Sequence, residues 1–581
     1  MTNIWKIYEK APDDILNELS GYPKIISQIL YNRGIKKKEE AHQFFNPDYQ
    51  KDLKDPFLIF GLKKAVERII LSIEKKERIM VYHDYDADGV CGSIVVASTL
   101  RELGVDFKTY TPDRQKDGYG LNKKAIEEIV KNGVDLLITV DCGITNAEEV
   151  ELLNGSGVDV IIIDHHLPSH ILPKAYATVN PKQKECSYEF KDMCAAGVAF
   201  KVSSALLHSE LGKKRGVKEG FEKWLLDVVA IATIADMMPL LGENRTLVKY
   251  GLLVIKKTKR IGLKKLIERA LNSKNGITSS SVAFQVAPKI NATSRMTHAS
   301  VSYELLSTES EDLAERLLES VESANNDRRK FVDKAVKDAI FWIEKEISEK
   351  GEVSDAIVIG SDEWTPGIVG LVSSRLTERY NRPSFVYGRV GNILKGSCRS
   401  INGFNIVEIM DECAQRDASI FKAFGGHAGA GGFSIFENKI QDFKKNILEI
   451  SKANIKDIPK QPILNIEAEI LPEEINYDTY NFIPKFEPFG QGNNIPIFLA
   501  RGLLVADAKL VGNGSKHLKL KLKSETKGSG VKFFDAVGFN MPEFYGKIAK
   551  GGKVDIVFTI EENEWNGRKS LQLKLKDIKL S

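Results

Sequence analysis

The stretch VDVIIIDHHLPSH, residues 158–170, contains an apolar run that stops abruptly at an aspartate followed by two histidines. The run from Val158 to Ile163 is typical of a buried parallel strand. A polar cluster before a proline is also an ordinary way for a strand to end, so this stretch alone does not establish a site. The chain nevertheless has only 9 histidines among 581 residues, and two of them stand side by side behind Asp164.

Two upstream stretches repeat this construction. RIMVYHDYDADG (78–89) is an apolar strand that ends in closely spaced aspartates, and VDLLITVDCGI (134–144) is another that ends at Asp141. Each predicted strand is followed by a helical pattern, which indicates an open α/β sheet with parallel strands. Ligands of such sheets gather outside the carboxyl ends of the strands. The sequence therefore predicts one functional site where these strands end.

Composition limits the class of protein. With 43% hydrophobic and 28% charged residues, the chain is typical of a globular protein with about three or four domains. The most apolar window, residues 224–241, is interrupted by Asp227 and Asp236, so we expect a buried helix there. The start lacks the pattern of a signal peptide and the six cysteines show no CxxC spacing, so we expect reduced thiols and a cytoplasmic location. The net charge of +4 permits a nucleic-acid partner without requiring one.

We expect the chain to be divided into five segments. Residues 1–75 are expected to be a helical extension, and residues 76–308 carry the strand and helix units. Residues 309–350 contain no Gly or Pro and predict a long helix, either a rigid connector or an ordinary amphipathic helix. Residues 351–458 form a second α/β domain, and residues 459–581 carry short β segments.

One short stretch of the last segment alternates strictly between apolar and basic residues. In HLKLKLK (517–523), Leu518, Leu520 and Leu522 fall on one face of a strand. The opposite face carries Lys519, Lys521 and Lys523. This pattern predicts a small β-barrel with one basic face, although lysines that only protect an exposed edge strand would give the same pattern. The sequence cannot separate base-stacking from core aromatics among Phe533, Phe534 and Trp565.

Carboxylates grouped with histidines admit an acid–base pair, an ion-pair network or a metal site. The many aspartates at these strand ends would repel one another strongly unless cations neutralise them. Oxygen ligands with imidazole suit Mn²⁺, with Mg²⁺ next, and the absence of thiolate ligands argues against structural zinc. Two such ions would activate water and bind a phosphoryl oxygen, so we expect hydrolysis of a phosphoester or phosphoanhydride. The chain has no GxxxxGK[ST] loop and no GxSxG elbow.

The motifs resemble those of a known superfamily. DYDADG, DCGI, DHH and ATIADMMPL (232–240) match, in this order, the motifs of the DHH phosphoesterase superfamily. Within it, the chain resembles the exonucleases specific for single-stranded DNA nearly from end to end. The further matching stretches are YNRGI, TPDRQKDGYGLN (111–122), APKINATSRM (287–296), KGSCRS (395–400), FGGHAGAGGF (424–433) and EPFGQGNNIPIF (487–498).

This resemblance implies an α/β fold class with a two-lobed core: a parallel-sheet DHH domain and a DHH-associated α/β domain, joined by the long helix. A β-barrel of the oligonucleotide/oligosaccharide-binding (OB) fold follows. It also implies degradation of single-stranded DNA from the 5′ end to mononucleotides in DNA repair and recombination, with two Mn²⁺ or Mg²⁺ ions. The implied metal ligands are Asp84, Asp86, Asp88, Asp141, His165 and Asp236, with Asp84 either a ligand or a neighbour of one.

The resemblance also implies individual roles. Asp86 and Asp88 each hold one metal, and Asp141 bridges both. His165 and Asp236 complete the second metal site. The implied catalytic residues are His166, which faces the scissile phosphate, the bridging Asp141, and Asp164, which orients His165 through a hydrogen bond.

Substrate contacts are implied in both lobes. Arg114, Ser397 and Arg399 match the site for the terminal 5′-phosphate, and Arg295 and His427 are further candidates. We expect GGHAGAGG around His427 to be too rich in glycine for regular structure and to approach phosphate or sugar closely, with a tight packing turn as the alternative.

Two positions depart from the usual pattern. Ser294 replaces a Gly, which puts the contact of Arg295 in doubt. His83 stands where Gly is common, and we expect it in a solvated loop, with metal or phosphate contact as the alternative.

Two other functions remain open. A small-substrate phosphodiesterase acting on oligoribonucleotides or cyclic dinucleotides typically lacks the β-rich tail and the N-terminal extension. An inactive replication-associated scaffold typically loses motif residues that are present in this chain. The expected partners are single-stranded DNA, a single-strand-binding protein and a repair helicase, and the expected state is a monomer.

Overall fold

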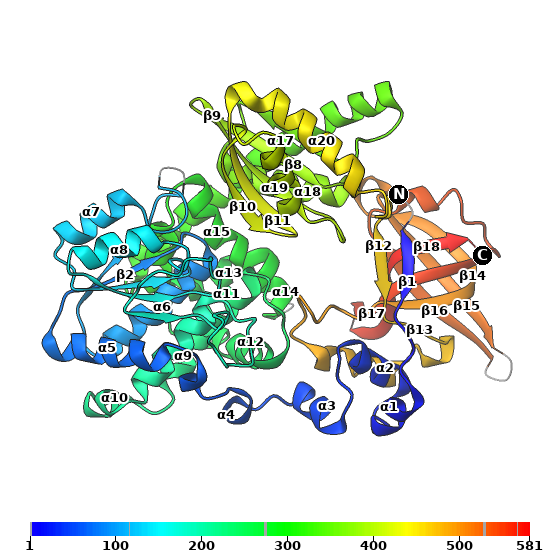
Figure 1. Ribbon diagram of the computed structural model, residues 1–581. Coiled ribbons are helices and arrows are strands. Elements are labelled where there is room, and N and C mark those ends of the chain that lie inside the picture. The colour runs from blue at the N-terminus through cyan, green and yellow to red at the C-terminus, as the bar shows by residue number, and fades with distance from the viewer. Residues whose placement is uncertain (1–2, 115–116, 272–275, 527–529, 566, 581) are drawn as a thin grey trace. The chain divides into compact units, whose positions relative to one another are not determined.

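The computed structural model describes residues 3–114, 117–271, 276–526, 530–565 and 567–580 (Figure 1). Its residues separate into two compact units. The main unit contains residues 53–238 and 247–460, and the tail unit contains residues 1–52, 239–246 and 461–581. The predicted N-terminal segment 1–75 is thus divided between the two units, and a short internal segment belongs with the tail.

The first domain of the main unit is built on a five-stranded parallel sheet. Its strands, in spatial order, are β3 (Phe107–Tyr110), β2 (Ile79–His83), β4 (Leu136–Val140), β5 (Asp159–Ile163) and β6 (Ala177–Val179). The chain passes from β2 to β3 on one side and returns to β4 on the other side of β2. The strand order therefore reverses between β2 and β4, which is where sheets of this type bind ligands.

Helices cover both faces of this sheet, so its central strands can be apolar throughout. On one face α7 (Lys123–Lys131) and α8 (Ala147–Gly155) pack on alternate residues of β2, β4 and β5 (Figure 1). On the other face lie α6 (Ala87–Glu102) and α9 (Ala195–Leu207). A Cβ on Gly92 of α6 would lie 2.7 Å from the side chain of Val140, so glycine lets this helix sit close to β4.

Further helices complete the domain. The predicted buried helix in 224–241 is confirmed as α11 (Leu226–Ala235), which is buried from Leu226 to Ile234. Among the described residues, no helix combines the length and apolar character that a membrane span requires. The remaining helices include α5 (Leu62–Lys75), α13 (Ile261–Ala270), α15 (Ala287–Met296) and α16 (Ser300–Ser307). The helix α12 (Gly242–Ile255) belongs to this unit from residue 247 onward.

The predicted long helix is present as α17 (Glu311–Lys350). The hydroxyl of Ser310 accepts a hydrogen bond from the N–H of Leu313 and caps its start. Gly351, with a left-handed φ of 84°, ends it. Its buried residues pack against α15 on one lobe and α18 on the other, so α17 joins the two lobes of the main unit.

The second lobe has a mixed five-stranded sheet in the order β10 (Phe421–His427), β11 (Ala430–Phe436), β9 (Ile393–Arg399), β8 (Ser384–Val390) and β7 (Ile357–Ser361). Only β7 and β8 are parallel. Around the sheet lie α18 (Pro366–Tyr380), α19 (Ile406–Arg416) and α20 (Ile440–Asn454).

The expectation that GGHAGAGG lacks regular structure is wrong. These residues form the antiparallel hairpin of β10 and β11, and β11 also pairs with β9. Glycine is disfavoured in β-strands, but hydrogen bonds to the neighbouring strands hold these residues in the sheet. The glycines allow close packing, because a Cβ on Gly431 would lie 3.0 Å from the sulfur of Cys398.

The tail unit contains the predicted barrel. Its strands are β13 (Ala468–Glu469), β14 (Phe498–Val511), β15 (His517–Thr526), β16 (Gly530–Gly538), β18 (Arg568–Leu580) and β17 (Lys553–Trp565), and pairing of β14 with β17 closes the sheet. Leu518, Leu520 and Leu522 are fully buried, as the alternation predicts. Within the same unit α2 (Lys24–Asn32) and α3 (Lys38–Phe45) share the barrel's hydrophobic core, and β1 (Ile4–Ile7) pairs with β12 (Ile463–Ile466).

Candidate metal centre

The acidic residues meet because neighbouring strands end in register. His83 is paired with Val140, and Val140 with Ile163. The next residues along these strands, Asp84, Asp141 and Asp164, therefore leave the sheet side by side, each with its N–H bonded to the neighbouring strand at 2.9 to 3.1 Å. The other candidates follow closely: Asp86 and Asp88 begin α6, His165 and His166 follow β5, and Asp236 ends α11.

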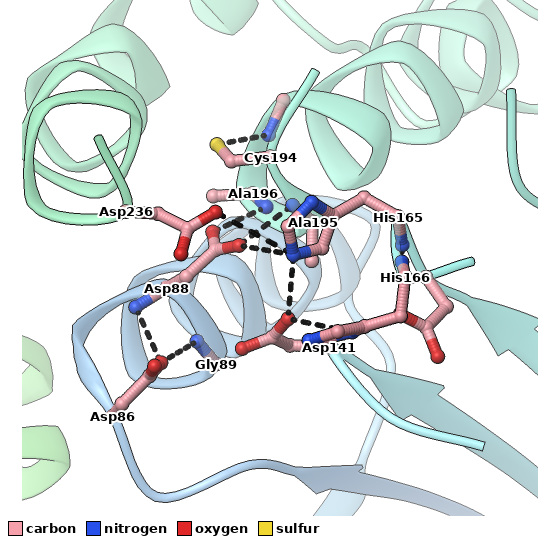
Figure 2. Close-up of polar contacts among 12 residues, drawn as sticks. Asp86, Asp88, Gly89, Asp141, His165, His166, Cys194, Ala195, Ala196 and Asp236 are labelled. Carbon is pink, nitrogen blue, oxygen red and sulfur yellow. Dashed lines mark hydrogen bonds and ion pairs between the residues drawn. The ribbon is translucent and has the colours of Figure 1, made fainter. Parts of the chain in front are cut away.

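One imidazole nitrogen is the centre of this group (Figure 2). The Nε2 atom of His165 lies 3.3 Å from Asp141 Oδ1, 3.5 Å from Asp236 Oδ2 and 3.7 Å from Asp88 Oδ2. Among the residues that the structure describes, three sets of side chains are close enough to share an ion, with all ligand atoms of a set within 4.8 Å of one another. These sets are Asp88, His165 and Asp236; Asp84, Asp86 and Asp141; and Asp141, His165 and His166.

Several carboxylate oxygens in the cluster are buried without a hydrogen-bond partner among the described residues. They are Oδ1 of Asp84, Oδ1 of Asp141 and Oδ2 of Asp236. Burial, and then the charges of the neighbouring aspartates, raise the pKa of Asp88 to about 7 and that of Asp236 to about 9. The same causes raise the pKa of Asp141 well above its usual range. Buried, unpaired carboxylates are unfavourable without a cation, so this donor set fits hard divalent ions.

Two of the aspartates are fixed by main-chain N–H groups. Asp86 caps α6, because its Oδ1 accepts hydrogen bonds from the N–H groups of Asp88 and Gly89. The carboxylate of Asp88 accepts bonds of 2.7 and 2.8 Å from the N–H groups of Ala195 and Ala196, in the first turn of α9. The sequence analysis missed this contact, because a main-chain donor has no characteristic side chain.

Asp164 holds His166 and not, as expected, the ring of His165. Its Oδ1 lies 2.8 Å from Nδ1 of His166, and its contact with His165 is made through the main-chain N–H at 2.7 Å. Nδ1 of His165 has no hydrogen-bond partner among the described residues. Although burial lowers the pKa of His166, the hydrogen bond and charge of Asp164 raise it above its ordinary value overall.

Tyr119 is a further residue of the site that the sequence analysis did not single out. Its hydroxyl donates to the carbonyl of Asp141 at 3.2 Å and lies 3.1 Å from Nδ1 of His166. The signal was present in DGYG, since Gly118 and Gly120 both have positive φ and form the turn that presents the tyrosine.

The expectation of a solvated loop for His83 is wrong. The side chain is fully buried at the end of β2, with Nδ1 2.6 Å from the carbonyl of Asp84 and Nε2 2.9 Å from the hydroxyl of Thr111. Both ring nitrogens are thus engaged with protein atoms. Ser294 fits within α15, where its hydroxyl donates to the carbonyl of Asn291. The next residue, Arg295, donates to the carbonyl of Gly367 in α18 at 2.8 Å.

The predicted phosphate-binding residues come from both lobes. The guanidinium of Arg114 lies 4.5 Å from the ring centroid of Tyr85. Ser397 and Arg399 face α18, because a Cβ on Gly370 would lie 3.3 Å from Ser397 Oγ and 3.4 Å from Arg399 Nη2. Burial, and then the charges of Arg114, Arg328 and Arg399, lower the pKa of Arg295 to about 9, so these guanidinium groups interact electrostatically. Arg328 of α17 was not predicted.

His427 lies at the exposed end of β10. Burial, and then the charges of His166 and Lys182, lower its pKa, so the second lobe brings this imidazole within electrostatic range of His166.

Comparison with known proteins agrees with this geometry. Family models match residues 78–233 (DHH family, N-terminal domain), 353–453 (DHHA1 domain) and 466–577 (RecJ OB domain). The fold and the cluster of aspartate and histidine define a phosphoesterase of the DHH superfamily.

Relatives identify the family within it. The single-stranded-DNA-specific exonuclease RecJ of Bacillus subtilis (strain 168) is 36% identical over 99% of this chain and 71% of its own length. The single-stranded-DNA-specific exonuclease RecJ of Haemophilus influenzae is 30% identical over 98% of this chain and 98% of its own length. The chain belongs to the RecJ family.

Solved structures support the same assignment. RecJ from Thermus thermophilus in complex with Mn²⁺ has a TM-score of 0.81 at 27% identity and covers 99% of this chain and 79% of its own. An exonuclease RecJ bound to manganese has a TM-score of 0.59 at 31% identity, covering 69% of this chain and 98% of its own. Both structures were solved with the ion that the donor set here suits.

Proposed function

We propose that this protein is a metal-dependent exonuclease that degrades single-stranded DNA from the 5′ end and releases 5′-mononucleotides. The observation that carries the proposal is the convergence of Asp88, Asp141 and Asp236 on one nitrogen of His165, with buried oxygens that lack a partner among the described residues. Its family membership supports the same activity.

The chain offers ligands for two ions. One would be held by Asp88, His165 and Asp236, and the other by Asp84 and Asp86, and Asp141 is close enough to both sets to serve both ions. When bound, the two ions would activate a water molecule and neutralise charge that develops on the phosphate. The N–H groups of α9 fix the orientation of Asp88, and the cap of α6 fixes that of Asp86, so two ligands are preorganised by main-chain donors.

His166 acts on the substrate in this proposal. Asp164 holds its Nδ1 and raises its pKa, so the ring keeps a fixed orientation and retains a proton more readily. A partly exposed imidazolium at this place can donate a hydrogen bond to an oxygen of the scissile phosphate.

Selection of the 5′ end is assigned to the arginines. A terminal phosphate carries more charge than an internal diester. One guanidinium group can bind two phosphate oxygens at once. Arg114, Arg295 and Arg399 supply such groups, and Ser397 supplies a hydroxyl. His427 is proposed as a further contact to the nucleotide.

The barrel is proposed to bind the single strand through contacts that do not depend on its sequence. Phe533 is 54% exposed, and the ammonium of Lys521 lies 5.1 Å from its ring centroid. A basic row beside an exposed ring suits phosphate contacts with base stacking. Phe534 is only 7% exposed and belongs to the core, while Trp565 lies outside the residues whose side chains the structure describes. Association with a single-strand-binding protein and a repair helicase, and the monomeric state, stay predictions.

The test is digestion of a long oligonucleotide labelled at either end. With Mn²⁺ present, we expect the 5′-labelled strand to release labelled mononucleotide at once and the 3′-labelled strand to release it only late. Blunt duplex DNA should not be digested, and a chelator should stop digestion of the single strand. A small-substrate phosphodiesterase would instead cleave dinucleotides faster than long strands, and an inactive scaffold would cleave neither substrate.

A further inference from the structure

The sheet edge that carries the aspartates also receives the end of β6. This strand pairs with β5 in register, with Val179 beside Ile163. The N–H of Asp164 donates to the carbonyl of Val179 at 3.1 Å. The chain that leaves β6, residues 180–183 (NPKQ), therefore starts beside Asp164 at the metal centre. Where β2, β4 and β5 bring aspartates to this edge, β6 is followed by a cation, Lys182.

The turn at 180–183 is held by its own side chains. Asn180 is fully buried, and its side-chain amide donates to the carbonyl of His166 at 2.9 Å. Its Oδ1 accepts a bond of 2.8 Å from the N–H of Lys182. The amide of the buried Gln183 donates to the carbonyls of Thr178 and Asn180 at 3.0 and 3.1 Å. The main chain of Lys182 is thus fixed against the histidine that is proposed to act on the substrate.

The side chain of Lys182 is not held in this way. It is partly exposed, and its ammonium makes no hydrogen bond or ion pair with any residue that the structure describes. Burial and neighbouring aspartates raise the pKa of Asp236 to about 9, and the charge of Lys182 opposes this rise. Burial and the charge of His166 lower the pKa of His165 to about 3, and Lys182 acts in the same direction. The ammonium therefore lies within electrostatic range of two proposed ligands of one ion.

The arginines act on the other ligand set. Burial and the charge of Asp86 raise the pKa of Asp84, and the charge of Arg114 opposes that rise. Burial and neighbouring guanidinium groups lower the pKa of Arg295 to about 9, and Asp86 opposes that change. A strand whose 5′-phosphate is held by the arginines, with its first linkage at the ions, would lead its second linkage toward Lys182.

Bound ions change what the ammonium of Lys182 requires. Divalent ions neutralise the carboxylates that otherwise attract it, so the ammonium is left beside a cationic site without a counter-ion. A phosphate of the substrate supplies that counter-ion. A lysine binds phosphate as a point charge with three donors and needs no fixed fork geometry, which suits a strand that moves after each cleavage.

We propose that Lys182 binds the second internucleotide phosphate of the strand, the one that follows the scissile linkage. After each cleavage this phosphate becomes the scissile one, so the contact holds the strand one nucleotide ahead of the reaction. A 5′-phosphorylated dinucleotide has no second linkage, and the contact therefore favours longer strands over dinucleotides. The inference rests on the proposed exonuclease and adds a substrate contact on the side of the metal centre that the arginines do not serve.

The test removes the two partners separately and together. Lys182→Met removes the charge of the side chain, and a methylphosphonate at the second linkage of a 5′-phosphorylated oligonucleotide removes that of the phosphate. The kcat/KM of the first cleavage is measured at saturating Mn²⁺. We expect either change alone to lower it about tenfold, and both together to lower it little further, because they remove the same charged contact. A methylphosphonate at the fifth linkage should affect the wild type and Lys182→Met equally.

Two further variants separate this contact from general effects. Lys184→Met is the matched control, since Lys184 is an exposed lysine two residues further along the chain, and it should respond to both modified strands like the wild type. Lys182→Arg keeps the charge and should keep most of the sensitivity to the second linkage. The inference is overturned if the methylphosphonate at that linkage lowers the kcat/KM of Lys182→Met as much as that of the wild type, or if Lys184→Met loses activity equally.

Binding gives a second measurement that does not depend on cleavage. Fluorescence anisotropy with the same oligonucleotides, with Ca²⁺ in place of Mn²⁺, should show the same loss of affinity for either change alone and little more for both. Equal sensitivity of the wild type and Lys182→Met to the second linkage would again contradict the contact. A wild type that binds single strands without degrading them refutes the proposed function and leaves this comparison intact.

Discussion

The carboxylate of Asp88 accepts a 2.7 Å hydrogen bond from the main-chain N–H of Ala195, a residue 107 positions further along the chain. The start of α9 thereby holds one aspartate of a crowded acidic group in a fixed orientation. Because the positive end of a helix favours negative charge, the same contact eases the repulsion that Asp86 and Asp141 exert on Asp88. Asp84, Asp141 and Asp236 each keep a buried carboxylate oxygen without a hydrogen-bond partner among the described residues, which leaves these oxygens available to cations.

Asp141 is the residue whose loss should affect both ions. Its Oδ1 is buried without a hydrogen-bond partner among the described residues and lies 3.3 Å from His165 Nε2. We expect Asp141→Ala to lower the rate of single-strand degradation in Mn²⁺ by roughly a hundredfold or more while the protein stays folded. Asp106→Ala, an exposed aspartate beside β3, is the control and should keep full activity. Near-normal degradation by a folded Asp141→Ala protein would show that the carboxylate does not bridge the ions.

Divalent ions should also stabilise the fold. The ion-free cluster contains several buried carboxylates, so an ion that binds only the folded state relieves their repulsion and raises the melting temperature. At a concentration about 100 times its Kd, one ion adds about 2.7 kcal/mol to the free energy of unfolding. A thermal melt with Mn²⁺ and then with excess chelator measures the effect, and Asp141→Ala should respond much less. Identical melts of the wild type with and without Mn²⁺ would contradict the metal assignment.

The site could be located from sequence because each strand has a local signature. Three apolar runs end in Asp84, Asp141 and Asp164, and a parallel sheet must bring those ends to one edge. The roles of the side chains within the site depend on longer-range contacts. Asp164 could as well have held His165 as His166, since the two rings follow it in sequence and only the fold decides which one turns back toward it.

Two features had no local signature at all. Residues 1–52 share a core with the barrel through α2 and α3, and Ile4 pairs with Ile463 in a separate two-stranded sheet. No pattern within either segment reveals these contacts. The hairpin of β10 and β11 forms although glycine is disfavoured in β-strands. The pairing of β11 with β9 outweighs that preference. Local patterns predicted the elements, whereas contacts between distant segments determined which of them share a core.

Arg399 is predicted to bind the terminal 5′-phosphate of the substrate. Its guanidinium faces α18 near Ser397, where a bidentate contact to a terminal phosphate is favourable. We expect Arg399→Ala to slow degradation of 5′-phosphorylated strands much more than that of 5′-hydroxyl strands. The ratio of the rate on 5′-phosphorylated strands to that on 5′-hydroxyl strands should fall by about tenfold or more, because one charged contact is lost. Arg389→Ala is a matched control on β8, where Arg389 pairs with Asp362. An unchanged ratio in Arg399→Ala would exclude this role.

The lysine row of β15 should set the salt dependence of binding. Deleting residues 459–581 would not test this cleanly, because it would expose the core that α2 and α3 share with the barrel. Replacing Lys519, Lys521 and Lys523 by serine leaves the buried leucines in place. Each lost phosphate contact should reduce the slope of log K against log salt by about 0.7 for single strands. Fluorescence anisotropy with a long oligonucleotide measures the slope, while kcat on short saturating oligonucleotides should stay unchanged.

The same substitution made elsewhere provides the control for this row. Lys444, Lys445 and Lys452 of α20 can be replaced by serine to remove the same net charge. A slope that falls equally in both triple variants would indicate a general charge effect and not a binding face.

Two adjacent phenylalanines on β16 should behave in opposite ways. Phe533 is 54% exposed beside Lys521, whereas Phe534 is 7% exposed within the barrel core. Phe533→Ala should weaken binding of single strands by about 1–3 kcal/mol, the usual value of one stacked base, with little change in melting temperature. Phe534→Ala should lower the free energy of unfolding by about 3–5 kcal/mol, since it leaves a cavity in the core. Fluorescence anisotropy measures the binding of both variants, and thermal melts measure their stability. If Phe533→Ala binds long strands as tightly as the wild type, the exposed ring does not stack on bases, and the strand must cross the barrel elsewhere.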